Sequence, residues 1–209
     1  RSRAAEDIVQ EVRGLVEVGY REITLLGQNV NSYGKDRAGS PDFPTLLEML
    51  CAIEGDFTLR FMTSHPKDAS DKLLNVMARE PKIARQFHLP LQSGSDRVLA
   101  AMNRKYTAES YLSLLKRMRT LMPDITVSSD MIVGYPTETE EDFAQTLEVL
   151  REAEFDMIFS FIFSPRPGTP AAKLPQLPDE VTHARFSRLL EVQNEISLRK
   201  NRAWIGKTC

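Results

Sequence analysis

The stretch HLPLQSGSDRVLAAMNR, from His88 to Arg104, changes character along its length. Phe87 to Leu91 forms a short apolar run, which predicts a buried strand. Asp96 to Met102 has the apolar spacing of a helix. Between them lies Gln92-Ser93-Gly94-Ser95, whose uncharged side chains can only form hydrogen bonds. A strand, a polar loop and a helix in this order predict one unit of an α/β fold.

The same order of elements recurs on both sides of this stretch. Helices are predicted around Ile8–Val16 with a stop at Gly19, around Leu46–Leu50, and at Asp71–Arg79, Asp96–Met102, Ala108–Leu121, Glu140–Glu154 and Glu180–Arg202. Strands are predicted at Glu22–Gly27, Thr58–Ser64, Phe87–Leu91, Ile125–Pro136 and Met157–Pro165. Strands that alternate with helices pair in parallel through right-handed crossovers. The chain is therefore predicted to be an α/β protein with five parallel strands.

Polar or glycine-bearing segments follow all five predicted strands. They are Gly27-Gln28-Asn29, Thr63-Ser64-His65-Pro66, Gln92-Ser93-Gly94-Ser95, Asp130 with Ile132, Gly134, Tyr135 and Pro136, and Ser164-Pro165-Arg166-Pro167-Gly168. Ligands of parallel sheets bind at the carboxyl ends of the strands. Amide, hydroxyl and backbone groups suit a neutral polar ligand, such as a ribose or the edge of a purine.

Each of these segments taken alone also fits a simple structural role. Serine and glycine are common in turns and helix caps. Asp130, a carboxylate in an apolar strand, needs either a structural partner or a function in the pocket. Both interpretations of Asp130 stay open, whereas the five segments together favour a shared pocket.

Composition and charge exclude several classes of protein. The 209 residues carry a formal charge of −2, which argues against a generally basic nucleic-acid binder. No apolar run is long enough to cross a membrane and no signal core opens the chain, so a cytoplasmic location without membrane contact is expected. The two cysteines, Cys51 and Cys209, and the three histidines have no metal-site spacing. Nucleophile-elbow, dinucleotide and P-loop motifs are also missing.

Two further segments of the sequence are charged, and the second has two interpretations. The acidic run from Thr137 to Asp142 predicts a helix start with Thr137 or Thr139 as the cap. The basic residues Arg199 to Arg202, with Lys207, fit a solvated helix end or a contact with a nucleic-acid backbone.

Five motifs together resemble those of the radical S-adenosylmethionine methylthiotransferases. They are GQNVNSYG (27–34), TSHP (63–66), HLPLQSGSDRVLAAMNR (88–104), SSDMIVGYPTETEEDF (128–143) and FSPRPGTPAA (163–172). The resemblance runs in order over nearly the whole chain, and it is strongest to the branch that modifies tRNA. The branch that modifies an aspartate of a ribosomal protein is the nearest alternative, followed by a non-catalytic α/β nucleoside-binding module.

The resemblance implies a fold and a division into domains. Residues 1–203 would form a partial (β/α)6 TIM-like radical SAM barrel, with helices outside and the first of six strands missing. Residues 204–209 would begin a truncated C-terminal RNA-binding domain. The edge left by the missing strand is expected to promote self-association of this fragment.

The resemblance also implies a reaction and its cofactors. The intact protein would use S-adenosylmethionine and two [4Fe–4S] clusters to add a methylthio group to C2 of N6-isopentenyladenosine in the anticodon loop of tRNA. The family's C-x-x-x-C-x-x-C motif is absent, and Cys51 and Cys209 cannot replace it, because a cluster requires several thiolates. Both clusters would therefore be ligated outside this chain, and the chain alone is expected to be inactive.

By the family pattern, Ile132 to Pro136 would face the adenine of S-adenosylmethionine, Gln92 and Ser93 would lie beside its ribose and methionine portions, and Gln28 and Asn29 would lie at its amino group. With the other strand-end residues, the expected cofactor-binding set is Gln28, Asn29, Ser64, Gln92, Ser93, Gly94, Asp130, Ile132, Gly134, Tyr135 and Pro136.

Overall fold

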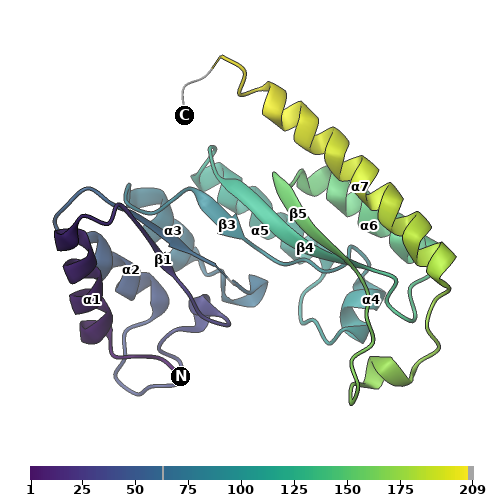
Figure 1. Ribbon diagram of the computed structural model, residues 1–209, viewed down its shortest axis with the longest axis horizontal. Coiled ribbons are helices and arrows are strands. Elements are labelled where there is room, and N and C mark those ends of the chain that lie inside the picture. The colour runs from purple at the N-terminus through teal and green to yellow at the C-terminus, as the bar shows by residue number, and fades with distance from the viewer. Residues whose placement is uncertain (63, 207–209) are drawn as a thin grey trace. The chain divides into compact units, whose positions relative to one another are not determined.

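The computed structural model describes residues 1–62 and 64–206, which form two compact units (Figure 1). Unit 1 comprises Arg1–His88 and Arg117–Ile125, and unit 2 comprises Leu89–Lys116 and the chain from Thr126 onward. Each unit is described by itself. Three residues named in the sequence predictions, Thr63, Lys207 and Cys209, lie outside the described residues.

Unit 1 alternates helices with short strands. Its elements are α1 (Ala5–Val18), β1 (Glu22–Leu25), the 3-10 turn η1 (Val30–Ser32), α2 (Phe43–Cys51), β2 (Thr58–Phe61), the 3-10 turn η2 (Pro66–Asp68), α3 (Asp71–Arg79) and β3 (Gln86–His88). β1 and β2 pair in parallel, with Glu22 opposite Thr58 and Leu25 opposite Phe61. Their core is fully buried and apolar, and includes Leu47, Leu50, Leu59, Leu74 and Met77.

Local sequence signals set the ends of the unit 1 helices. α1 ends at Gly19, whose φ of 101° is the left-handed conformation that glycine adopts without a steric penalty. The Asp42 side chain accepts from the Thr45 backbone N–H at the start of α2, and the Ser70 side chain accepts from the Leu73 N–H at the start of α3. These caps satisfy backbone donors that a helix leaves unpaired at its first turn.

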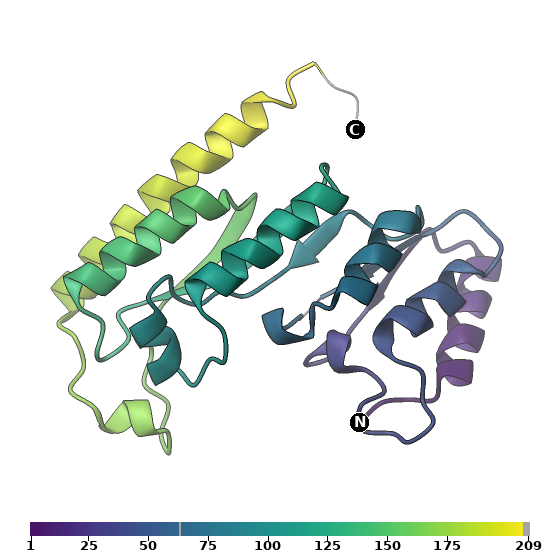
Figure 2. The same ribbon diagram turned by 180° about the vertical axis from the view of Figure 1, so that it is seen from behind.

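Unit 2 has the same alternation with longer elements. They are α4 (Asp96–Ala101), α5 (Ala108–Leu121, which continues into unit 1 at Arg117), β4 (Thr126–Val133), α6 (Glu140–Ala153), β5 (Met157–Ile162), the 3-10 turn η3 (Pro170–Lys173) and α7 (Asp179–Arg202). β4 and β5 pair in parallel, with Ser128 opposite Met157 and Val133 opposite Ile162. Figures 1 and 2 show α6 and α7 together on one side of these two strands.

The chain from Leu89 to Gln92 runs alongside β4 without forming a regular strand. The Leu89 N–H donates to the Ser128 carbonyl (2.8 Å) and the Gln92 N–H donates to the Asp130 carbonyl (2.8 Å). Between them the Leu91 N–H donates to Ser129 Oγ (2.9 Å) and not to a backbone carbonyl, so the ladder is interrupted. The predicted strand Phe87–Leu91 is therefore assigned only over Gln86–His88.

The predicted α/β class is confirmed, and the two described strand pairs β1–β2 and β4–β5 are parallel as predicted. The strands are shorter than predicted at their carboxyl ends, where β1 stops at Leu25, β2 at Phe61, β4 at Val133 and β5 at Ile162. The polar segments therefore lie beyond the strands, except that Asp130 and Ile132 lie within β4. Among the described residues, no helix has the length and apolarity that a membrane crossing requires.

Candidate ligand-binding site at the strand ends

In unit 2, the residues after β4 form a tight turn that begins at Gly134. Gly134 has a φ of 81°, and a Cβ atom there would lie 2.6 Å from the Thr182 Cγ2 atom on α7. The Gly134 N–H donates to Glu138 Oε2 (3.0 Å), and the Glu138 N–H donates to the Tyr135 carbonyl (2.8 Å). Glycine is required here by both the backbone conformation and the close approach of α7.

A buried ion pair supports this turn from the side of α7. Arg185 Nη1 lies 2.9 Å from Glu138 Oε2 and also donates to the Glu138 carbonyl (3.1 Å). The Glu138 side chain is only 1% exposed, and this burial raises its pKa, although hydrogen bonds from Gly134 and Arg185 oppose the shift. Neither residue was among the predicted site residues, because nothing in the local sequence pairs Glu138 with an arginine 47 positions away.

The predicted residues of this turn differ in what their side chains contact. The Tyr135 hydroxyl donates to the Ala101 carbonyl (2.9 Å), and its ring lies edge-on to Phe163 with centroids 5.3 Å apart. Pro136 is buried, whereas Ile132 is only partly buried. The structure thus uses Tyr135 as a packing residue and leaves part of the Ile132 side chain accessible.

Gln92 is brought directly beside Asp130 and Ile132. Its N–H donates to the Asp130 carbonyl, and its own carbonyl accepts from the Ile132 N–H (2.9 Å). Gln92 is buried and has a φ of 76°, which is uncommon for a residue other than glycine. Such conformations concentrate at functional sites. Gln92, Asp130 and Ile132 form the part of the predicted set that the structure groups most clearly.

Ser93 and Gly94 face α6. The Ser93 hydroxyl lies 3.3 Å from the Thr146 hydroxyl, which also accepts from the Gly94 N–H (3.0 Å). A Cβ atom on Gly94 would lie 2.6 Å from the Thr146 Cα atom. These contacts provide the structural role that serine and glycine often have in such loops, and they hold the Gln92 loop against α6.

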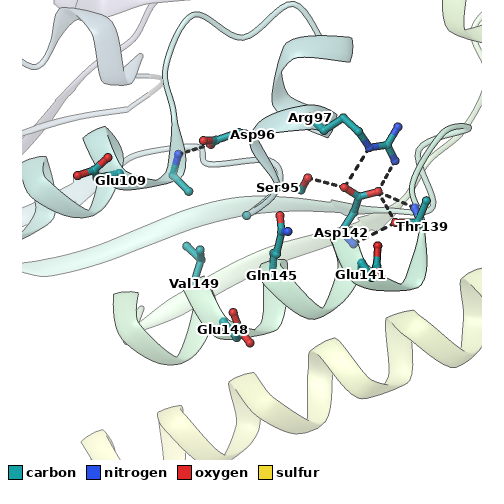
Figure 3. Close-up of a pocket in the computed structure, with 12 residues that line it drawn as sticks. Ser95, Asp96, Arg97, Glu109, Thr139, Glu141, Asp142, Gln145, Glu148 and Val149 are labelled. Carbon is teal, nitrogen blue, oxygen red and sulfur yellow. Dashed lines mark hydrogen bonds and ion pairs between the residues drawn. The ribbon is translucent and has the colours of Figure 1, made fainter.

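A cavity of about 690 Å³ lies behind this loop, between α4 and α6 (Figure 3). Asp142 Oδ1 accepts from the Ser95 hydroxyl (2.6 Å), and the Asp142 carboxylate pairs with Arg97. Burial alone would raise the pKa of Asp142, but hydrogen bonds from Arg97, Ser95 and Thr139 outweigh it and hold the pKa well below its usual range. Thr139 and Asp142 form a capping box, so the predicted helix start is confirmed with Thr139 as the cap. Of the predicted cofactor-binding residues, Gly94 alone lines this cavity in the part of the chain that the structure describes.

In unit 1, Gln28 is exposed and Asn29 is part of a polar cluster at the carboxyl end of β1. The Asn29 amide donates to Asp68 Oδ2 (2.7 Å), and Lys35 pairs with the other Asp68 oxygen. Burial would raise the pKa of Asp68, but the hydrogen bonds from Lys35 and Asn29 lower it. Gln28 and Asn29 line a cavity of about 860 Å³ whose described lining residues do not include Ser64.

Several buried polar atoms of unit 1 have no hydrogen-bond partner among the described residues. They are Asn29 Oδ1, Ser64 Oγ and both amide atoms of Asn31, a residue that is 6% exposed. Leaving such atoms unpaired costs about 1–3 kcal/mol each, so a bound polar group or water is expected to satisfy them. Asn31 was not among the predicted site residues, because its burial cannot be read from the neighbouring sequence.

The described residues contain no cluster of His, Cys, Asp or Glu that could hold a metal ion. Cys51 lies on α2, and burial raises the pKa of its thiol to about 11. A thiol of this kind is a poor source of the thiolate that a cluster needs. Residues 1–62 and 64–206 therefore do not fit an iron–sulfur cluster.

The Radical SAM superfamily model matches residues 1–150. The chain is 54% identical over its full length to a Clostridium novyi (strain NT) protein named tRNA-2-methylthio-N(6)-dimethylallyladenosine synthase, and 52% identical to a Caldicellulosiruptor saccharolyticus protein of the same name. It covers 46% and 45% of these two proteins. The chain thus spans about half the length of the curated relatives it matches.

Solved structures of other proteins share the fold of this chain. Coproporphyrinogen III oxidase of Escherichia coli, described as a radical SAM enzyme, matches with a TM-score of 0.69 and 16% identity, over 91% of this chain and 45% of that one. Streptococcus suis SuiB bound to S-adenosylmethionine matches with a TM-score of 0.55 and 16% identity, over 96% of this chain and 40% of that one. The match to the family model covers more than half of the chain, and the order of elements agrees with it. The chain belongs to the radical SAM superfamily.

Proposed function

We propose that the intact protein adds a methylthio group to C2 of N6-dimethylallyladenosine in the anticodon loop of tRNA. The observation that carries this proposal is the identity of 50–54% with proteins named for that product, over 99–100% of the chain. The aligned region extends through both units. The proposed substrate also implies a cytoplasmic location.

S-adenosylmethionine is the proposed cofactor, and the residues present fit it. In unit 2, the proposed binding residues are Gln92, Ser93, Gly94, Asp130, Ile132, Gly134, Tyr135 and Pro136. Of these, Ile132 to Pro136 would face its adenine, and Gln92 and Ser93 would lie beside its ribose and methionine portions. In unit 1, Gln28 and Asn29 are the proposed partners of its amino group, and Ser64 is a further proposed binding residue. The unpaired buried atoms Asn29 Oδ1 and Ser64 Oγ support the presence of a polar ligand there.

The chain's own residues would bind and orient the reactants. Gln92, held by two hydrogen bonds to β4, would present its backbone beside Asp130 and Ile132. The Glu138–Arg185 pair would keep the Gly134 turn in one conformation. S-adenosylmethionine in this family supplies radical chemistry once it is bound near a reduced [4Fe–4S] cluster. Since the described residues do not fit a cluster, we propose that both clusters of the intact protein are ligated by residues outside this chain, and that the chain alone is inactive.

We also propose that the isolated 209-residue chain self-associates. In unit 1 the sheet order is β1–β2, so β1 is an edge strand. Unpaired edge strands tend to pair with other chains.

The test uses the intact protein, reconstituted with iron and sulfide without oxygen and supplied with reductant and S-adenosylmethionine. The substrate is tRNA that already carries N6-dimethylallyladenosine. Digestion and mass spectrometry of the nucleosides should reveal a 2-methylthio product. An active preparation that modifies a ribosomal-protein peptide but leaves the tRNA unchanged would contradict the proposal.

A further inference from the structure

One face of the β4–β5 pair carries large apolar side chains that remain exposed. Met157, Phe159 and Phe161 alternate along β5 and are 49%, 40% and 53% exposed. Alternate residues of a strand point to the same side of the sheet. The three side chains therefore form one apolar stripe, which we call the β5 stripe.

The β5 stripe is continuous with two of the proposed site residues. The parallel register places Asp130 opposite Phe159 and Ile132 opposite Phe161. Paired residues of neighbouring strands project to the same face of a sheet. The β5 stripe thus lies on the same face as Asp130 and Ile132, and β4 separates it from the loop of Gln92.

The opposite face of β4 is covered. Val127, Met131 and Val133 alternate with Ser128, Asp130 and Ile132 along β4 and are fully buried. Figures 1 and 2 show α6 and α7 on one side of β4 and β5. Single exposed apolar residues are common, but a contiguous row of them in a strand marks a binding surface.

We infer that the β5 stripe binds the dimethylallyl group on N6 of the substrate adenosine. This inference rests on the proposed function. The dimethylallyl group is a branched five-carbon apolar substituent, so its binding site needs apolar surface, and the C2 atom that reacts must lie near the bound S-adenosylmethionine. The β5 stripe provides the apolar surface, and it adjoins Asp130 and Ile132 of the proposed S-adenosylmethionine site. The six residues of this face, Ser128, Asp130, Ile132, Met157, Phe159 and Phe161, include no cation, so the face does not suit a phosphate.

The first readout is binding, measured with the intact protein and two RNA stem-loops that differ only in the dimethylallyl group. Fluorescence anisotropy gives the affinity for each RNA without turnover. One methylene more or less in a hydrophobic pocket changes the preference for one ligand over another by about 10- to 200-fold. Phe161→Ala should therefore weaken binding of the dimethylallyl RNA by about 10-fold or more and leave binding of the unmodified RNA unchanged. Phe161→Leu, which retains an apolar side chain, should restore most of the preference.

Leu198→Ala is the matched control, because Leu198 is also apolar and 54% exposed but lies on α7. This variant should bind both RNAs like the unchanged protein. The inference is overturned if Phe161→Ala and Met157→Ala both keep the full preference for the dimethylallyl RNA.

The second readout separates this inference from the proposed function. If the unchanged protein forms the methylthio product and Phe161→Ala loses the preference in both binding and kcat/KM, both proposals are supported. If the unchanged protein forms the product and the variants keep the preference, the inference about the β5 stripe fails alone. If the unchanged, fully reconstituted protein binds the RNA but never forms the product, the proposed function fails.

Discussion

At Gly94 the backbone passes so close to α6 that a side chain has no room. An added Cβ would lie 2.6 Å from the Thr146 Cα atom and 2.8 Å from the Gln145 carbonyl oxygen, and neither backbone atom can move independently. Gly94→Ala is expected to destabilise unit 2 by about 1–3 kcal/mol, the usual cost of overpacking. Urea unfolding followed by circular dichroism measures this loss.

Gly14→Ala is the control for Gly94→Ala. Gly14 lies inside α1, and a Cβ atom there would meet nothing within 4 Å among the described residues. Alanine is favoured over glycine in a helix by about 1 kcal/mol, so this variant should be slightly more stable than the unchanged chain. Equal stability of the Gly94→Ala and Gly14→Ala variants would contradict the close packing of the loop on α6.

Asp142 should make stability depend on pH in the acid range. Its pKa is lowered in the folded state, since the opposing effect of burial is outweighed by the hydrogen bonds from Arg97, Ser95 and Thr139. An unfolded aspartate titrates near about 3.9, so this contribution is fully present above that pH and is lost as the pH falls toward the lower folded pKa. Asp142→Asn should cost about 2 kcal/mol at neutral pH and much less at about pH 2.

Unfolding midpoints of the Asp142→Asn variant across this range measure the effect. The exposed Asp124, in the turn before β4, gives the control Asp124→Asn. A stability difference between Asp142→Asn and the unchanged chain that stays constant down to about pH 2 would show that the Asp142 network does not set this pH dependence.

Residue roles that depend on local chemistry were predictable from the sequence. Thr139 was one of two predicted caps, because the two residues of a capping box lie within four positions of the sequence. Asn31 and Glu138 were missed. Their significance depends on burial and, for Glu138, on a partner on α7, and neither property can be read from the neighbouring sequence. Grouping of Gln92 with Asp130 and Ile132 was expected from the parallel sheet, whereas the positive φ of Gln92 was not.

At the scale of elements, α7 is joined to the turn after β4 by one buried ion pair. Arg185→Met would leave the Glu138 carboxylate buried without its cation, and the expected cost is about 3–5 kcal/mol. The double variant Glu138→Gln with Arg185→Met should recover part of this loss, because no charge is then left buried. Denaturant unfolding of the three proteins measures both effects.

Arg188→Met provides the comparison for Arg185→Met. Arg188 lies one turn further along α7 and pairs with Glu140, but its side chain is about half exposed. Exposed ion pairs contribute about 0–1 kcal/mol, so this variant should be nearly as stable as the unchanged chain. Similar losses for Arg185→Met and Arg188→Met would mean that the buried pair has no special role in joining α7 to the turn.

Element bounds were predictable to different degrees. α3 and α5 have the predicted bounds, since apolar spacing and a cap or a following proline define them. The strands end earlier than predicted, because an apolar residue beyond the last ladder hydrogen bond looks the same in sequence as one within the strand. The strand predicted at Phe87–Leu91 is interrupted for a different reason, because the Leu91 N–H donates to the Ser129 side chain and not to a carbonyl of β4.

At the scale of the whole molecule, the isolated chain is expected to associate with itself. β1 is an edge strand of the unit 1 sheet, and the β5 stripe adds exposed apolar surface in unit 2. Light scattering coupled to size exclusion should show dimers or larger species at micromolar concentration. A single species of 23.7 kDa at all concentrations would contradict this expectation.

The proposed function makes this chain part of a radical enzyme that acts on C2 of dimethylallyladenosine. The most direct test supplies the reconstituted intact protein with RNA that carries deuterium at C2 of that nucleoside, and analyses the 5′-deoxyadenosine that is formed from S-adenosylmethionine. We predict that the deuterium appears in 5′-deoxyadenosine and that the RNA gains a methylthio group. Formation of 5′-deoxyadenosine without deuterium, or no formation by a fully reconstituted protein, would contradict the claim.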